Sequence, residues 1–216
     1  MAARLIIGVL LACCSTSSMA DKLDTNGEDP VAYYRYIAGV HQWLGVPRSV
    51  VEETRLVLQR EAAELVPIGR DRFGRTHYLA PEAAAAWHRL RLAAGEAGIE
   101  FVVISSFRSA EYQARLARRH MEEGRVPELL FRAIALPGYS EHHTGCALDL
   151  ASEEHPKLSQ EFREAPAYAW LREHAAGFGF RESYPPGNRK GIMPEPWHWF
   201  YKPCKASLDD DGRAVP

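Results

Sequence analysis

The sequence predicts one α+β domain in which helices flank a small antiparallel sheet. Three observations support this class. The 216 residues are 46% hydrophobic and 25% charged, as in a soluble globular protein large enough to bury its own core. Stretches of helical periodicity are interspersed with short apolar runs typical of strands. The main part of the sequence shows neither an internal repeat nor a linker that would divide it into two domains.

The first 20 residues are expected to form a signal peptide. Arg4 precedes an apolar run over residues 5–14, which is shorter than the roughly 20 residues needed to span a bilayer. Ser18-Met19-Ala20 places small residues where a signal peptidase cleaves. Leu10-Leu11-Ala12-Cys13 also resembles a lipobox, so a membrane anchor through lipidation at Cys13 stays open. Both alternatives predict export to the periplasm or the cell envelope.

Residues 21–64 are predicted to be a leader followed by a helical extension. Apolar residues recur at helical spacing from Pro30 to Leu44, and Gly45-Val46-Pro47 ends that helix. A second helix is predicted from about Ser49 to Ala63.

Residues 65–204 are predicted to form the main domain. It opens with a short strand at residues 65–69 and a hairpin that turns at Phe73-Gly74. Pro81 then begins an alanine-rich helix that reaches about Ala97, because proline is favoured in a first helical turn.

The middle of this domain is expected to contain a buried strand, from Glu100 to Ser106. Ser109 can cap the helix that follows, which extends to about Glu123. A turn at Leu136-Pro137-Gly138 precedes a strand from Cys146 to Leu150.

The last part of the domain is predicted to contain a helix from Pro166 to Ala176, which stops at Gly177. Phe178-Gly179-Phe180 leads into a strand, and the aromatic run from Trp197 to Tyr201 is typical of another. Residues 205–216 form an acidic tail.

The overall charge argues against one class of partner. The net charge is −2 and no long basic run is present, which argues against nucleic acid as a partner. We expect a monomer.

Cys146 and Cys204 lie in the main domain. We predict two free or buried thiols there rather than a disulfide, because two cysteines are too few to indicate a disulfide framework.

The segment from Ser140 to Asp149 is rich in side chains that bind metals. Imidazole and carboxylate both bind zinc, at about 2.0–2.2 Å. An extended chain would separate His142 from Asp149 by roughly 23 Å, so the backbone must fold back between them, and Thr144-Gly145 is where it can. The neighbouring His143 stays open as an alternative ligand.

Glu195-Pro196-Trp197-His198 forms a second cluster. A catalytic zinc ion usually has three protein ligands and leaves one position for water. His142, Asp149 and His198 are therefore predicted to bind one Zn²⁺ ion, and Glu195 is free to act as general base. Pro196 can bend the chain so that both side chains face the same site.

These two motifs resemble those of the VanY-type D-alanyl-D-alanine carboxypeptidases, which are similar to lysostaphin-like peptidases and hedgehog signalling domains. The motifs are Ser-x-His-x-x-Gly-x-Ala-x-Asp, ending at Asp149, and Glu-Pro-Trp-His, ending at His198. The similarity covers about residues 65–201 and implies a sheet that carries zinc. Further roles implied by the resemblance are transition-state stabilisation by Arg108 and substrate binding by Ser140 and Gln113.

The expected function is that of a zinc-dependent carboxypeptidase that trims D-alanyl-D-alanine, or L,D-linked, ends of peptidoglycan stem peptides. Two alternatives stay open: an endopeptidase that cuts the wall crosslink, and a zinc-stabilised wall-binding module without turnover. Glu195 argues against the binding module, because a module without catalysis needs no general base.

Overall fold

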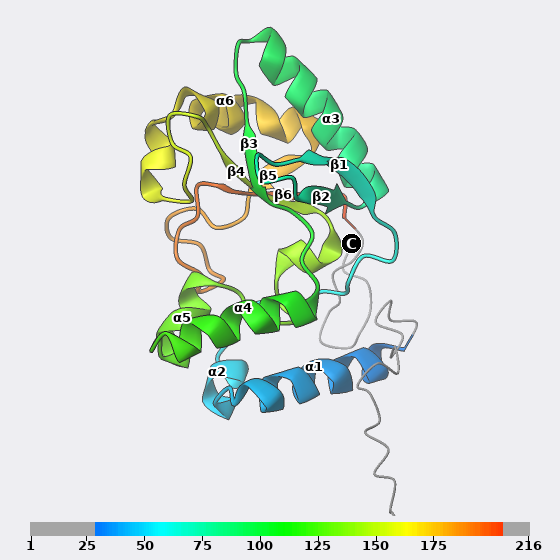
Figure 1. The fold of residues 1–216 in the computed structure, drawn as a ribbon, viewed down its shortest axis with the longest axis vertical. Helices are drawn as coiled ribbons and strands as arrows, with labels where there is room; N and C mark the ends of the chain where they lie inside the picture. The colour runs from blue at the N-terminus through cyan, green and yellow to red at the C-terminus, as the bar shows by residue number, and fades with distance from the viewer. Residues whose placement is uncertain (1–28, 205–216) are drawn as a thin grey trace, which may run out of the picture.

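The computed structural model describes residues 29–204 (Figure 1). The predicted signal peptide, with Cys13, and the acidic tail lie outside the described residues. The helices are α1 (Pro30–Leu44), α2 (Arg48–Glu52), α3 (Pro81–Glu96), α4 (Ala110–Glu122), α5 (Pro127–Ala133) and α6 (Pro166–His174), with the 3₁₀ helices η1 (Glu141–Thr144), η2 (Gln160–Glu164) and η3 (Ala175–Phe178). The strands are β1 (Val66–Arg70), β2 (Thr76–Leu79), β3 (Val102–Ser105), β4 (Ala147–Ala151), β5 (Phe180–Glu182) and β6 (His198–Tyr201). Between residues 29 and 204, no helix is both long and apolar enough to cross a membrane.

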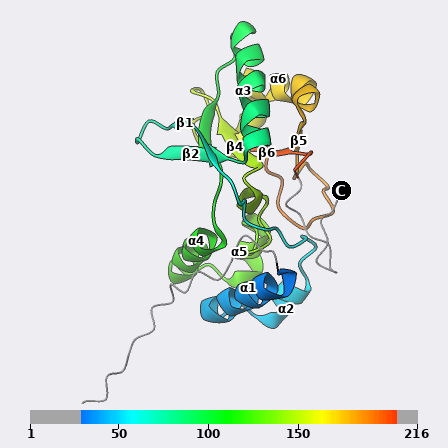
Figure 2. The same ribbon diagram turned by 90° about the vertical axis from the view of Figure 1, so that its right-hand side faces the viewer.

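Two antiparallel sheets are present in the described part of the chain. β3, β4, β6 and β5 pair in that order, while β1 and β2 form a separate hairpin. In Figures 1 and 2 the four-stranded sheet lies with α3 and α6 in the upper half of the molecule, and α1, α2, α4 and α5 form the lower half. This architecture confirms the predicted α+β class.

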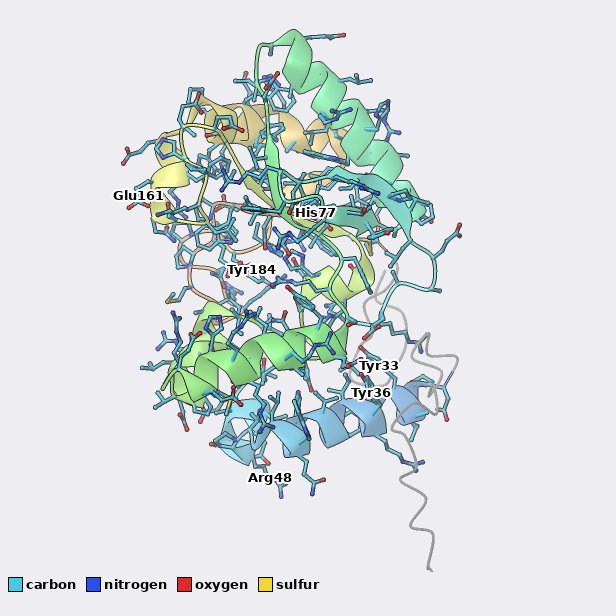
Figure 3. All side chains as sticks on the ribbon, viewed as in Figure 1. Tyr33, Tyr36, Arg48, His77, Glu161 and Tyr184 are labelled. Carbon is cyan, nitrogen blue, oxygen red and sulfur yellow. A yellow bond between two sulfur atoms is a disulfide. The ribbon has the colours of Figure 1, made fainter. Side chains whose placement is uncertain are left out.

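The main hydrophobic core lies between the four-stranded sheet, α3 and α6. The strand predicted from Cys146 to Leu150 is present as β4, and Cys146, Ala147, Leu148 and Leu150 all lie in this core. Smaller apolar clusters join the lower helices. Tyr33 lies on the side of α1 that faces α4 and packs with Ala110 (Figure 3).

The second predicted helix, from Ser49 to Ala63, is wrong beyond its first turn, since α2 ends at Glu52. The chain then runs along the loop before β4: the N–H of Gln59 donates to the carbonyl of Gly138 at 2.7 Å, and that of Ala62 to His143 at 2.8 Å. These tertiary hydrogen bonds override the helical propensity of the segment. Helix α5 was not predicted.

The prediction of two free thiols is also wrong, because Cys146 and Cys204 form a disulfide with Cα atoms 6.2 Å apart. The physical reason is the pairing of β4 with β6. The N–H of Tyr201 donates to the carbonyl of Cys146 at 2.8 Å, which brings the two ends of these strands together.

Gly145 allows the chain reversal that the sequence predicts between His142 and Asp149. Its φ is +66°, and a Cβ atom there would lie 2.8 Å from the backbone nitrogen of Ala80. Gly145→Ala should therefore lower the free energy of unfolding by about 2 kcal/mol or more and the melting temperature by about 4–8 °C. Gly95→Ala is the control, because its Cβ would meet nothing within 4 Å and alanine favours helix. Equal melting temperatures for the two variants would contradict the role given to Gly145.

Candidate metal centre

Two strands and one 3₁₀ helix bring the three predicted ligands together. Asp149 in β4 and His198 in β6 are direct partners in the antiparallel register. His142 lies in η1, where the hydroxyl of Ser140 accepts a hydrogen bond from the His142 N–H at 3.4 Å. One ligand atom from each of His142, Asp149 and His198 lies within 4.8 Å of the other two, and all three residues are buried.

The distances within this group suit a metal ion. Asp149 Oδ1 lies 3.2 Å from His142 Nε2 and 3.0 Å from His198 Nδ1. Ligands bound to a tetrahedral zinc at about 2.0–2.2 Å stand about 3.3 Å apart. His142 Nδ1 lies 2.6 Å from the carbonyl oxygen of Ser106. A carbonyl only accepts, so Nδ1 carries the hydrogen and the neutral ring presents a lone pair at Nε2. His142 Nε2 and Asp149 Oδ1 are then two acceptors that face each other, and a cation between them would stabilise this arrangement.

The pKa values of the group agree with this arrangement. Burial lowers the pKa of His142 to about 4, so the ring is neutral at pH 7 and can bind a metal. Burial opposes ionisation of Asp149, but the two histidines hold its pKa below the ordinary value. Burial would also lower the pKa of His198, yet hydrogen bonds with Asp149 and Glu141 raise it to about 10. The pocket therefore strongly favours positive charge.

His143, the alternative ligand, already uses both ring nitrogens. Its Nδ1 donates to the carbonyl oxygen of Arg108 at 2.6 Å, and its Nε2 accepts from the N–H of Gly138 at 3.0 Å. Burial lowers the pKa of His143 to about 3. The neutral ring thus links its own segment to those of Arg108 and Gly138. Because both ring nitrogens are used, no lone pair remains for a metal.

Glu195 stands beside the group without belonging to it. The N–H of His198 donates to the carbonyl of Glu195 at 3.1 Å, which closes a turn through Pro196 as the sequence predicts. This turn places Glu195 Oε2 3.8 Å from His198 Nδ1. Burial raises the pKa of Glu195 to about 8, a value suited to a group that exchanges protons near neutral pH.

The remaining predicted site residues lie at different depths. Arg108 Nη2 is 3.8 Å from Asp149 Oδ2, and its side chain is 18% exposed. Ser140 is buried where it caps η1. Gln113 is fully buried; its Nε2 donates to the carbonyl of Ala135 at 2.8 Å, and its Oε1 has no hydrogen-bond partner in the described part of the chain. The substrate-binding roles of Ser140 and Gln113 stay predictions.

Sequence reasoning missed a second layer around the site. Glu141 is buried, and its Oε2 accepts from His198 Nε2 at 3.0 Å. Tyr184 places its ring centroid 4.8 Å from that of His198. A signal for Glu141 was available, because metal-ligating histidines usually donate their second N–H to a carboxylate or carbonyl, and Glu141 lies inside the first motif.

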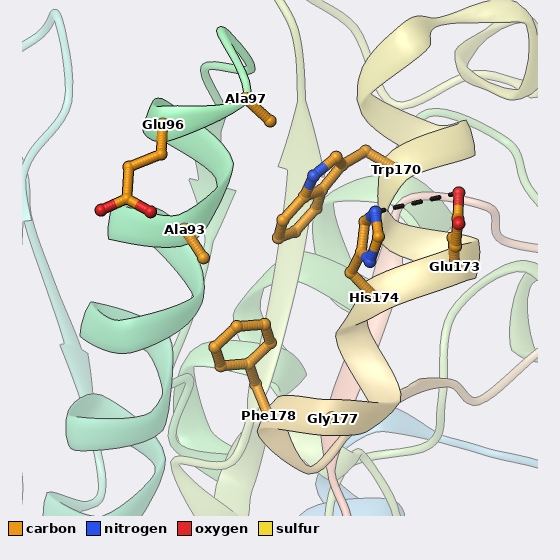
Figure 4. A pocket seen from close by; sticks show the side chains of 8 residues that line it. All are labelled: Ala93, Glu96, Ala97, Trp170, Glu173, His174, Gly177 and Phe178. Carbon is orange, nitrogen blue, oxygen red and sulfur yellow. Dashed lines mark ion pairs between the residues drawn. The ribbon is translucent and has the colours of Figure 1, made fainter.

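A cleft of about 620 Å³ lies elsewhere, between α3 and the segment formed by α6 and η3. Trp170 and Phe178 form its aromatic wall (Figure 4). None of the predicted site residues lines it. We therefore assign this cleft no part in the chemistry.

Comparison with known proteins agrees with the geometry. A family model described as VanY, D-alanyl-D-alanine carboxypeptidase, matches residues 76–204. The bifunctional D-Ala-D-Ala dipeptidase and D-Ala-D-Ala carboxypeptidase VanXYC of Enterococcus gallinarum is 33% identical over 130 residues, which are 57% of this chain and 67% of that protein. The chain spans about half or less of two further carboxypeptidase relatives, 51% of one and 43% of the other.

Solved structures show the same fold. The LdcB LD-carboxypeptidase superposes with a TM-score of 0.60 at 28% identity, over 68% of this chain and 74% of that one. A variant of the vancomycin-resistance D,D-pentapeptidase VanY, solved in complex with Zn(II), gives 0.53 at 24% identity, over 68% and 86%. The predicted class, a zinc metallo-carboxypeptidase, is confirmed at the level of the family. Since the match covers more than half of its residues, the chain belongs to the VanY family of D-alanyl-D-alanine carboxypeptidases.

Proposed function

We propose that this chain is a zinc-dependent carboxypeptidase that removes the terminal residue from peptidoglycan stem peptides. One observation carries the proposal: ligand atoms of His142, Asp149 and His198 converge within 4.8 Å, and the Glu195 carboxylate stands 3.8 Å from one of them. The relatives support the substrate class, since VanXYC is named for D-Ala-D-Ala and LdcB for LD-carboxypeptidase activity. We further propose that the protein acts as a monomer in the periplasm or cell envelope.

In this mechanism His142, Asp149 and His198 hold the zinc ion. Zinc, when bound, supplies a Lewis acid that polarises the scissile carbonyl and lowers the pKa of water. Glu195 accepts the proton of the attacking water and passes it to the leaving amine. Arg108 stabilises the negative charge that develops on the carbonyl oxygen. The side chain of Glu195 is 13% exposed, which limits the contact of its carboxylate with bulk water.

Digestion of purified muropeptides, followed by mass spectrometry, tests the proposal. We expect loss of one terminal residue, and no reaction when a chelator has removed the metal. Substrates ending in D-Ala-D-Ala and in an L,D-linked D-Ala decide the stereochemistry of the bond. Scission of the crosslink would identify an endopeptidase instead. Bound zinc without hydrolysis of any wall peptide would identify a binding module.

A further inference from the structure

Glu141 connects a lysine to one of the predicted metal ligands. The residue is 4% exposed. Its Oε2 lies 3.0 Å from His198 Nε2, and its Oε1 lies 2.5 Å from Lys190 Nζ. Burial of a carboxylate is costly unless partners satisfy its oxygens. Although burial would raise the pKa of Glu141, His198 and Lys190 together bring it below the ordinary value.

Lys190 is held in place by its own loop between β5 and β6. The side chain of Asn188 accepts from the N–H of Lys190 at 3.1 Å and donates to the carbonyls of Pro185, at 3.0 Å, and Ile192, at 2.9 Å. The Lys190 ammonium also lies 5.2 Å from the ring centroid of Tyr184, within cation–π range. These contacts fix the direction from which the ammonium approaches Glu141.

A ligating imidazole must present a lone pair to the metal while its other nitrogen is held by an acceptor. Glu141 is that acceptor for His198, since Nε2 faces its Oε2 and Nδ1 faces Asp149. A carboxylate that is held at one oxygen can still rotate about its bond to the side chain. Lys190 binds the second oxygen, Oε1, and so keeps Oε2 directed at Nε2.

We propose that Lys190 is a positioning residue of the metal site, which acts through Glu141 to orient His198. The proposal rests on the proposed function, because it needs His198 to bind a metal. The proposal predicts that zinc affinity falls, although a simple charge effect would raise it. Removal of a nearby positive charge should by itself favour binding of a cation, whereas loss of a positioning contact should weaken it.

The test is the zinc dissociation constant of the full chain, measured by competition with a chromophoric chelator. Lys190→Met should weaken zinc binding about tenfold, at the lower end of the effect of outer partners of metal ligands. Lys190→Arg should restore most of the affinity. Arg189→Met is the matched control, because it removes the same charge from the neighbouring exposed position; zinc binding there should be unchanged or slightly tighter.

A double-mutant cycle separates positioning from a general effect on the fold. In a Glu141→Gln background, Lys190→Met should weaken zinc binding no further, because the route through Glu141 is already broken. The positioning role would be overturned if Lys190→Met bound zinc as tightly as the natural chain. It would also be overturned if the double variant weakened zinc binding by the product of the two single effects. Either result would leave the proposed function standing. A natural chain that binds no zinc would overturn this role and the proposed function together.

Discussion

Replacement of Glu195 by glutamine is expected to lower the rate of peptide hydrolysis by about 10²–10⁴-fold, the usual contribution of a general base. The amide has the shape of the carboxylate but cannot take the proton from water. Glu195 is not among the three residues whose ligand atoms converge, so zinc should remain bound. The measurement is kcat/KM on a synthetic stem peptide, together with the zinc content of the same sample.

Glu161→Gln provides the control for this experiment. Glu161 is exposed on η2, and its replacement should leave both activity and zinc content unchanged. If the Glu195→Gln enzyme kept more than about a tenth of the natural rate, another group would have to accept the proton. If it lost zinc as well, Glu195 would have to be counted as a ligand.

The strands that hold the site could be predicted because their patterns are local. Cys146, Leu148 and Leu150 occupy every second position of the sequence, so the strand period of two predicts that Asp149 points to the opposite face from these three residues. The need for a chain reversal at Gly145 followed from distances alone. The bend at Pro196 followed from the chemistry of proline.

The features that the sequence did not reveal depend on residues far apart in the chain. The segment after α2 is extended because its N–H groups find carbonyls at Gly138 and His143, and no local pattern records those partners. The disulfide depends on the pairing of β4 with β6. His142 and His143 are adjacent residues of the same type, and only the motif favours His142 in the sequence. The structure adds a physical reason, because both ring nitrogens of His143 are already used in hydrogen bonds.

Replacement of Asp149 by asparagine is expected to weaken zinc binding by at least about 100-fold, more than loss of an outer partner, and to abolish hydrolysis. Asp149 Oδ1 faces both His142 Nε2 and His198 Nδ1. Asparagine keeps the volume but removes the negative charge and brings an amide N–H₂ toward the ion. At free zinc 100-fold above its Kd, the natural chain should gain about 2.7 kcal/mol of stability, a rise in melting temperature of about 5–10 °C.

At the same zinc concentration, the Asp149→Asn variant should gain about 0.4 kcal/mol or less, a shift of roughly 1 °C. His88→Gln controls for adventitious binding, because His88 is an exposed histidine of α3; it should show the full shift of the natural chain. Melting in the presence of a chelator gives the baseline for each variant, so any loss of intrinsic stability is measured separately. A zinc-dependent shift that survives Asp149→Asn but disappears in His88→Gln would place the ion on the surface and remove the basis for the proposed catalysis.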